Sequence, residues 1–390
     1  MRQLVFVFVM SLIILFTGES INQGRGKVKE LQIEKEDTFR LSLLFIGDIM
    51  QHEPQINSAW DEETGTYSYD HCFQYVKDIY EITDVTIANL EFTFGGKPYK
   101  GYPQFSAPDK MGVAIKNAGI DVLVTANNHT CDRGKSGIIR TINVIDSLEI
   151  LRTGSFLDSA DREKHNPLII DKNGMRVALL NYTYGTNGLP IPSPTIVNLI
   201  DTNIILSDII KAKSYHPDEI IIVYHWGNEY ERMHNAKQTE IAEFSFRHGV
   251  GILIGSHPHV IQPIHKYEYP KLSGMEVAVV YSLGNYISNQ RQQYRDGGIM
   301  VYLNLIKIGN LVKIEKMGYI LTWVWTPIID GKKRYYIVPV SKYEQEANFF
   351  DAPSYEKFKV FRDDTRKHLQ KNNINVDEIL WDEKLRQWVF

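Results

Sequence analysis

Cysteine is scarce in this chain. The sequence contains two cysteines, Cys72 and Cys131, among 390 residues. Two thiols cannot form the several bridges of a disulfide-stabilised domain, so that class of protein is excluded. One bridge remains open for a protein that leaves the cytoplasm, but two unpaired thiols are the simpler interpretation and the one we expect.

An excess of positive charge is also lacking. Lys and Arg together number 43 against 47 for Asp and Glu, which gives a formal net charge of −4. Proteins that bind nucleic acids present basic patches that neutralise phosphates, and this composition offers no such footprint. We therefore expect no nucleic-acid partner. Internal repeats are missing as well, which excludes repeat architectures.

Long hydrophobic runs are confined to the N-terminus. Arg2 precedes an apolar run from Leu4 to Phe16 that only Ser11 interrupts. A membrane span needs about 20 apolar residues, so a secretory signal peptide fits this length better. The small-residue pattern of a cleavage site is poor here, which leaves an uncleaved membrane anchor open. Residues 1–19 thus predict export to the cell envelope or beyond, and residues 20–40 predict a polar linker.

Short apolar runs alternate with amphipathic stretches through the middle of the chain. Such runs are typical of strands buried on both faces, and the stretches between them have helical periodicity. We predict strands at Leu41–Ile46, Val85–Ala88, Val122–Thr125, Val177–Leu180, Ile220–Tyr224, Gly251–Ile254 and Val277–Tyr281. We predict helices at Tyr69–Tyr80, Asp109–Asn117, Lys135–Leu148, Asp201–Lys213 and Lys237–His248. The alternation predicts an α/β fold with helices outside the sheet.

The pattern changes in the last quarter of the chain. Ile299–Ile306 and Leu311–Thr322 alternate apolar and polar side chains around a Gly-Asn pair, which predicts a β-hairpin. Tyr335–Val340 predicts one more strand, and the residues that follow are charged with a helical pattern. We therefore divide the folded part into a main domain at residues 41–340 and a helical tail at residues 341–390.

Polar side chains directly follow five of the predicted strands. Ligands of open α/β sheets bind beyond the carboxyl ends of the strands, so a site is expected at these positions. In chain order the strand ends carry Asp48, then Glu91, then Asn127, Asn128 and His129 with Asp132 close behind, then His225, and last His257 and His259.

Taken singly, none of these groups indicates a site. An aspartate after a strand is commonly a helix N-cap, and paired asparagines commonly form a turn. Five strands that end in carboxylate, imidazole and amide groups have no reason in stability, because burying unpaired charge is costly. Joint ligation of metal explains all five, and this ligand set suits zinc, manganese or iron. We predict a site for one or two divalent ions.

Several side chains are candidates for the surroundings of that site. Glu229 can hydrogen-bond a ligand histidine, with a surface salt bridge as the equal alternative. Asn285 follows a predicted strand and can reach the site or serve as a turn residue. Arg133 can hold an anionic substrate group, although a solvated charge at a helix start is the simpler interpretation. The loop at residues 181–188 has glycines and hydroxyls suited to shaping a pocket, or to an ordinary turn.

The order of the motifs resembles a known family. Gly-Asp, Asn-Leu-Glu, Asn-Asn-His, His-x-Gly-x-Glu and Gly-Ser-His-Pro-His occur in this order between Leu41 and Ile306. This series is similar to the CapA family of capsule or poly-gamma-glutamate synthesis proteins, which is similar in turn to the calcineurin-like metallophosphoesterases. The resemblance implies a sandwich of two facing β-sheets flanked by helices, with metals bound at one rim.

The resemblance also implies roles for individual residues. His129 matches a histidine thought to protonate the leaving oxygen, and Asn127 and Asp132 lie beside it in the sequence. The metal ligands that it implies are Asp48 and His259 for one ion, Asn128, His225 and His257 for the other, and Glu91 at a position that bridges the two.

One residue departs from the pattern of the wider superfamily. Its first motif is Asp-x-His, whereas this chain has Met50 after Asp48. A thioether is a poor ligand for manganese and a mediocre one for zinc, so the first ion has one ligand fewer. His52 lies close enough in sequence to replace the missing imidazole, and a solvent-facing or capping role for His52 is the equal alternative.

Three functions are compatible with these features. The first is metal-dependent hydrolysis in the synthesis or processing of capsule or poly-gamma-glutamate, an anionic polymer, outside the cytoplasm. The second is a non-catalytic component, tethered to the membrane, that binds or guides this polymer. The third is a secreted metallophosphoesterase whose substrate is a phosphoester unrelated to capsule. The missing histidine at Met50 favours the second function, whereas His129 favours hydrolysis.

Overall fold

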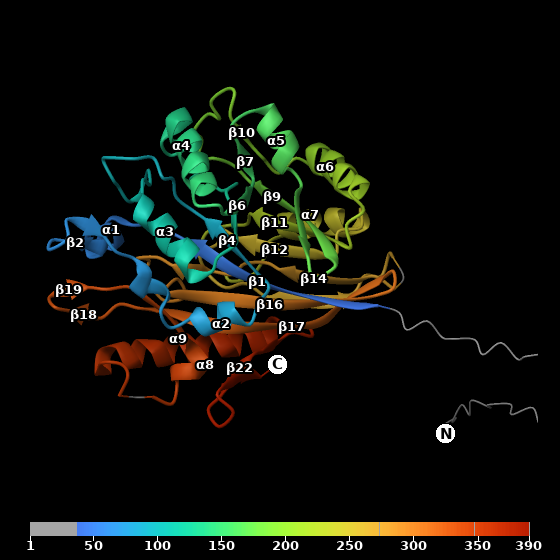
Figure 1. Cartoon of the computed structure of the whole chain (residues 1–390). Coiled ribbons are helices and arrows are strands. Elements are labelled where there is room, and N and C mark those ends of the chain that lie inside the picture. Colours follow the sequence, from blue (N-terminus) through green and yellow to red (C-terminus); the bar gives the residue numbers. More distant parts are fainter. Residues whose placement is uncertain (1–36, 273, 347, 390) are drawn as a thin grey trace, which may run out of the picture. The chain divides into compact units, whose positions relative to one another are not determined.

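A computed structural model describes residues 37–272, 274–346 and 348–389 (Figure 1). The predicted signal peptide or anchor at residues 1–19, and the linker as far as residue 36, lie outside the described residues. The last predicted linker residues are instead part of the first strand, β1 (Thr38–Ile49). None of the helices in the described ranges has the length and apolar character needed to cross a membrane.

Two β-sheets form the centre of the structure. In the larger sheet the strand order is β20-β17-β16-β1-β4-β5-β6, and β15 and β21 pair at its sides. Its strands besides β1 are β4 (Val85–Leu90), β5 (Val122–Val124), β6 (Leu151–Thr153), β15 (Asn285–Ile287), β16 (Gly297–Ile308), β17 (Leu311–Trp325), β20 (Tyr336–Pro339) and β21 (Asp377–Glu378). The second sheet has the order β13-β14-β12-β11-β9-β8. Its strands are β8 (Leu168–Lys172), β9 (Met175–Thr183), β11 (Glu219–His225), β12 (Ile252–Ser256), β13 (Ile264–Glu268) and β14 (Glu276–Val280).

The two sheets pack face to face. Alternate residues of β1, such as Leu43 and Phe45, belong to one apolar cluster with Ile221 and Ile254 of the second sheet. The intervening residues of β1 belong to a different cluster on the opposite face of the larger sheet. Burial on both faces explains why the middle of β1, from Leu43 to Ile46, is apolar at every position. Each fully buried large side chain contributes about 1.5–3 kcal/mol to the free energy of folding.

Helices cover the outer faces of both sheets (Figure 1). The larger sheet carries α3 (Asp109–Ala118) and α4 (Gly134–Ser147), whose Ile115 and Ile145 join its outer cluster. The second sheet carries α6 (Thr202–Ser214) and α7 (Ala236–Arg247). These four helices match the predicted ranges within two residues at each end. The prediction of an α/β sandwich of two facing sheets flanked by helices is confirmed.

The helix predicted at Tyr69–Tyr80 is interrupted. It is replaced by a short 3-10 helix, η1 (Asp70–Phe73), and by α2 (Lys77–Glu81). The apolar residues have helical spacing, but Phe73 and Val76 are both fully buried, and Val76 leaves the helical region with φ −118° and ψ 2°. Tertiary packing therefore takes precedence over local periodicity here.

The predicted hairpin is present as β16 and β17, whose register pairs Ile308 with Leu311 across a two-residue turn. The next predicted strand is β20, but it ends one residue early, and α8 (Val340–Tyr343) begins there. In the tail, α9 (Ala352–Asn372) buries Phe358, Phe361 and Leu369. The tail is not helical to its end, because β21 adds to β17 and a separate small hairpin follows.

Smaller elements complete the described residues. They are α1 (Glu53–Ala59), β2 (Trp60–Asp61), β3 (Thr66–Tyr67), β7 (Ser155–Phe156), α5 (Ser159–His165), β10 (Ile196–Val197), β18 (Ile328–Ile329), β19 (Lys332–Lys333), β22 (Leu380–Asp382) and β23 (Gln387–Val389). Both cysteines are buried and unpaired, as the simpler interpretation of the sequence predicts.

Candidate metal centre

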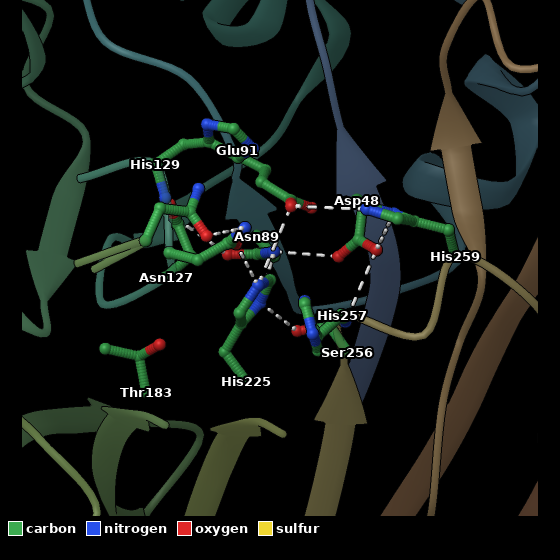
Figure 2. A network of polar contacts seen from close by, with 12 residues as sticks. Asp48, Asn89, Glu91, Asn127, His129, Thr183, His225, Ser256, His257 and His259 are labelled. Carbon is green, nitrogen blue, oxygen red and sulfur yellow. Dashed lines mark hydrogen bonds and ion pairs between the residues drawn. The ribbon is translucent and has the colours of Figure 1, made fainter. Parts of the chain in front are cut away.

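Polar side chains from both sheets converge at the carboxyl ends of their parallel strands (Figure 2). In the larger sheet, β1 and β4 run parallel, and they present Asp48 and Glu91. In the second sheet, β11 and β12 run parallel, and they present His225, His257 and His259. Because the sheets face each other, four strand ends from distant parts of the chain supply one cluster.

The five side chains form two overlapping sets of possible metal ligands. Ligand atoms of Asp48, Glu91 and His225 lie within 4.8 Å of one another, and so do those of Glu91, His257 and His259. Glu91 Oε1 is 3.6 Å from Nε2 of both His225 and His259. Glu91 therefore occupies the shared position, and all five residues are buried.

The cluster fits a cation because three of its polar atoms lack a hydrogen-bond partner in the part of the chain that the structure describes. Both carboxylate oxygens of Glu91 and Nδ1 of His257 are buried without a hydrogen-bond partner among the described residues. A buried carboxylate with no donor is costly, and a bound divalent ion supplies the missing partner. Carboxylate oxygens with imidazole nitrogens are ligands that zinc, manganese and iron accept.

The electrostatics of the cluster support the same conclusion. Burial and the neighbouring charge of Asp48 raise the pKa of Glu91 well above its ordinary value. Burial and the adjacent His257 ring lower the pKa of His225 well below its ordinary value. Burial, together with His259, lowers the pKa of His257 to about 3. These two imidazoles are therefore neutral at physiological pH, which is the form that binds metal.

A network of amide groups holds the ligands in place. Asn89 Nδ2 donates to Asp48 Oδ1 at 2.7 Å, and Asn127 Nδ2 donates in turn to Asn89 Oδ1 at 3.3 Å. Donors of this kind orient metal-ligating carboxylates. Asn128 Oδ1 lies 2.7 Å from His225 Nε2, the nitrogen that is also 3.6 Å from Glu91, so this amide oxygen lies among the ligand atoms themselves. The sequence-based assignment gave Asn89 no role, although the residue belongs to the Asn-Leu-Glu motif.

His129 lies beside the ligands and is held from behind. Its Nδ1 is 2.8 Å from Asp132 Oδ2, and the same oxygen accepts a hydrogen bond from the Phe105 backbone N–H at 2.7 Å. The Phe105 ring packs against the imidazole, with 4.6 Å between the ring centroids. The orientation of the ring is therefore fixed, and Nε2 is left for the substrate side.

The backbone of the Gly-Ser-His-Pro-His motif is unusual. His257 and His259 have φ values of +99° and +57°, a region that residues with side chains seldom adopt. Such strain persists where the surrounding structure imposes it, and it is frequent at functional sites. Gly255 is required for a different reason, since a Cβ there would come within 2.0 Å of the Tyr281 carbonyl oxygen.

A cavity of ≈ 300 Å³ opens next to the ligands. Its walls come from both sheets and from the loops that follow their strands. The residues that line it are Met50, His52, Tyr102, His129, Glu229, Tyr230, His259, Asn289, Gln290, Gln292 and Arg295. The cavity thus contains His129 and one of the five side chains of the cluster, His259.

Comparison with known proteins identifies the family. The family described as "Bacterial capsule synthesis protein PGA_cap" matches residues 42–290, which is more than half of the chain. The chain belongs to this family. The match includes every strand that contributes to the cluster of ligands.

Two curated members of the PGA_cap type are similar to this chain. The "PGA biosynthesis protein CapA" of Bacillus subtilis is 28% identical over 290 residues, which are 72% of this chain and 71% of that protein. The "Capsule biosynthesis protein CapA" of Bacillus anthracis is 27% identical over 271 residues, which are 66% of this chain and 62% of that protein. The predicted resemblance to the CapA family is confirmed.

Solved structures with a likeness to this one include a calcineurin-like phosphoesterase and a nucleotidase. The calcineurin-like phosphoesterase YfkN of Bacillus subtilis has 14% identity and a TM-score of 0.43, and the match covers 86% of this chain and 99% of that one. The NAD nucleotidase of Haemophilus influenzae has 13% identity and a TM-score of 0.47, with coverages of 88% and 65%. The family assignment depends on the sequence match.

The structure places the other predicted site residues in different ways. Asn285 reaches the site, because its Oδ1 lies 3.1 Å from His259 Nδ1. His52 lines the cavity, but its Nδ1 faces Gln55 and the Asn289 backbone, and it belongs to neither set of ligand atoms. Glu229 lies on the exposed part of the cavity wall rather than behind a ligand histidine.

Arg133 does not contribute to the cavity. It is the N-cap residue of α4, and its side chain lies against Gly95 and Gly137. The simpler interpretation of Arg133, a charge at the start of a helix, therefore describes the structure better than an anion-binding role. The loop at residues 181–188 does reach the site, since the Tyr184 ring packs 4.5 Å from the His257 ring.

Proposed function

We propose that this member of the PGA_cap family is a metal-dependent hydrolase that acts in the synthesis or processing of a capsule polymer. The observation that carries the proposal is the shared, unpaired position of Glu91 between two sets of ligand atoms, next to a cavity that also contains His129. A site built only for stability would pair its buried carboxylate with donors of its own.

The residues that would hold the ions are the five of the two sets, with Asn128 as an additional oxygen ligand. Bound ions would supply Lewis acidity, which polarises the bond to be broken and favours ionisation of water. The chain contributes the rest of the chemistry. The amides of Asn89 and Asn127 orient the ligands, and the walls of the cavity position the substrate.

His129 is the proposed proton donor to the leaving group. Its Nδ1 is held by Asp132, whose carboxylate stabilises a positively charged imidazole. The ring therefore presents Nε2 to the cavity in a fixed direction. A residue that only bound polymer would need neither this aspartate behind it nor its buried position.

The proposed substrate follows from the family. One curated relative is named for PGA biosynthesis and another for capsule biosynthesis, so the proposed substrate is poly-gamma-glutamate or a related anionic polymer. The N-terminal apolar run at residues 4–16 supports export, and work on this polymer outside the cytoplasm or at the membrane.

A second function, polymer binding without hydrolysis, is favoured by one observation. Met50 lines the cavity where the wider superfamily has a histidine, and His52 does not replace that ligand. A centre with one ligand fewer binds its ion more weakly, and a weakly held ion can bind carboxylates without turnover.

The test measures hydrolysis of poly-gamma-glutamate and of a chromogenic aryl phosphodiester by the purified protein with Mn²⁺ or Zn²⁺. Hydrolysis that is lost in His129→Ala, with the metal content unchanged, supports the proposal. Polymer binding without hydrolysis by the wild-type protein supports the second function instead. Hydrolysis of the phosphodiester alone indicates a phosphoesterase that has no role with the polymer.

A further inference from the structure

Arg295 is a cation at the metal centre without a carboxylate partner. It lies in the loop between β15 and β16 and lines the ≈ 300 Å³ cavity together with His129 and His259. Its guanidinium carbon is 3.2 Å from the centroid of the Tyr230 ring. Among the described residues, no carboxylate lies within ion-pair distance of its guanidinium.

Arg232 is a second arginine that stacks on a tyrosine, but it also has a carboxylate partner. Its guanidinium lies 4.1 Å from the centroid of the Tyr294 ring, so it also stacks on a tyrosine. It differs from Arg295 in having an ion pair, 2.8 Å from Asp364 Oδ2, and it does not line the cavity. Stacking alone therefore does not explain why the cation at the cavity has no counter-ion.

The position of Arg295 is tied to the metal ligands. Asn285 Nδ2 donates to the carbonyl oxygen of Arg295 at 2.8 Å, while Asn285 Oδ1 lies 3.1 Å from His259 Nδ1. One amide side chain thus fixes both the backbone that carries the guanidinium and a ligand imidazole. A cation held in this way is pre-organised for a ligand, since little freedom remains to be lost on binding.

We propose that Arg295 anchors an anionic group of the substrate that offers two oxygens, either a carboxylate or a pair of phosphate oxygens. The planar guanidinium donates to two oxygens at once, which an ammonium group cannot do. The proposal rests on the proposed function, because it places the anchored group beside the same metal centre. The carboxylate of Glu229, on the exposed part of the cavity wall, repels an anion. The anchored group therefore lies next to Arg295 and away from Glu229.

The test compares Arg295→Gln with Arg232→Gln, which removes an equivalent stacked guanidinium outside the cavity. The affinities of the Mn²⁺-loaded full-length protein for inorganic phosphate and for a short gamma-linked glutamate oligomer are measured by calorimetry. We expect Arg295→Gln to weaken binding of at least one probe by about tenfold or more, the size of a charged hydrogen-bonded contact. The weakened probe identifies the source of the anion. Arg232→Gln should stay within about twofold of the wild type.

Two further variants separate anchoring from a structural role. Arg295→Lys keeps the positive charge but cannot donate to two oxygens at once. Its affinity for the anionic probes should therefore lie between those of the wild type and Arg295→Gln. Glu229→Gln should tighten binding by a smaller factor, and both effects should shrink at high salt. Thermal melting shows that each variant is folded.

Equal affinities of Arg295→Gln and Arg232→Gln for both probes would overturn the anchor. This comparison needs no turnover, so its failure differs from failure of the proposed function. If the protein is inactive but still binds anions through Arg295, the proposed hydrolysis is wrong and the role of Arg295 in anion binding is supported. Hydrolysis that is unaffected by Arg295→Gln, with unchanged affinity and KM, keeps the enzyme and rejects the anchor.

Discussion

Two polar clusters in this protein both contain buried ionisable groups, but they differ in how completely those groups are paired. One is built on Arg152, whose side chain is 2% exposed and which donates to Asp146 at 2.6 Å and to Asp161 at 2.9 Å. The other is the cluster around Glu91, where neither carboxylate oxygen has a hydrogen-bond partner among the described residues. Both clusters bury ionisable groups near the end of the larger sheet's strands.

The difference lies in whether the protein supplies all the partners. The guanidinium of Arg152 is surrounded by two carboxylates and the Ser155 carbonyl, so nothing further can bind to it. In the cluster around Glu91, both Glu91 carboxylate oxygens and His257 Nδ1 are buried without a hydrogen bond from the described residues, although Asn89 donates to Asp48. A completed cluster stabilises the fold, and an incomplete one indicates a ligand.

The largest effect should come from Glu91→Gln. Removal of the shared carboxylate should reduce turnover by more than about 100-fold, because ligands of both sets lose a common partner. The metal-free protein should be at least as stable as the wild type, because an unpaired buried acid is replaced by a neutral amide. Turnover assays and urea unfolding in the presence of a chelator measure the two effects. If the metal-free Glu91→Gln protein is clearly less stable than the metal-free wild type, then Glu91 stabilises the fold and is not an unsatisfied ligand.

Arg152→Met should have the opposite effects: it should lower the stability of the protein and leave metal binding unchanged. Two carboxylates would lose their common cation, but Asp146 is half-exposed and Asp161 keeps His165 at 2.8 Å, so we expect a loss of about 1.5–3 kcal/mol in the free energy of unfolding. Metal content per folded molecule should not change, because the cluster shares no residue with the ligands. Urea unfolding and elemental analysis check the two statements, and Asp146→Asn is a milder control because its side chain is 47% exposed. Loss of metal from folded Arg152→Met protein would show that the two clusters are not independent.

Added metal should stabilise only the incomplete cluster. At an ion concentration of 100 times Kd, binding to the native state adds about 2.7 kcal/mol to the free energy of unfolding. The melting temperature of the wild type and of Arg152→Met should therefore rise with Mn²⁺ or Zn²⁺, while that of Glu91→Gln should not. Equal shifts in all three proteins would indicate binding elsewhere.

Glu219 is an intermediate case and gives the smallest expected effect. Its carboxylate accepts from the backbone N–H groups of Ile220 and Gly251, and no cation of the described ranges forms an ion pair with it. Burial raises its pKa from 4.5 to about 7. The folded state then holds this proton more tightly than the unfolded chain. The contribution to stability is therefore complete below pH 4.5 and is lost as the pH rises through 7.

Glu219→Gln should remove this pH dependence. The full pKa shift corresponds to about 3 kcal/mol, and partial solvent exposure of Glu219 reduces the expected gain in stability to about 1–2 kcal/mol at pH 8. The difference should vanish near pH 4. Chemical unfolding across this pH range, with metal removed by a chelator, measures the difference. A stability difference that is the same at every pH would mean that the pKa of Glu219 does not change between the unfolded and folded states.

Much of this fold could be predicted from the sequence because the strands are buried on both faces. Runs such as Val177–Leu180 and Ile220–Tyr224 have no charged interruptions, and α3, α4, α6 and α7 have regular apolar spacing. The end of the tail could not be predicted in this way, since β21 depends on pairing with β17, a strand far away in the sequence. Local pattern does not contain that information.

The ligands could be proposed because they directly follow predicted strands, whereas the cavity walls could not. Arg295 lies in a loop with no motif, and only the folded chain shows that it faces the cavity while Arg133 does not. Asn89 was hidden for another reason. It directly follows the predicted strand Val85–Ala88, but an asparagine there is also typical of a turn, and only the structure shows that β4 continues to Leu90 and that Asn89 lies 2.7 Å from Asp48.

The most direct test of the central claim, that an incomplete buried cluster holds metal, is elemental analysis of the purified full-length protein. The protein is exposed in turn to manganese, zinc and iron, desalted and measured beside His225→Ala. We predict one or two tightly bound ions per wild-type chain and a clear loss in the variant. Wild-type protein that is folded and retains none of the three metals would contradict the account.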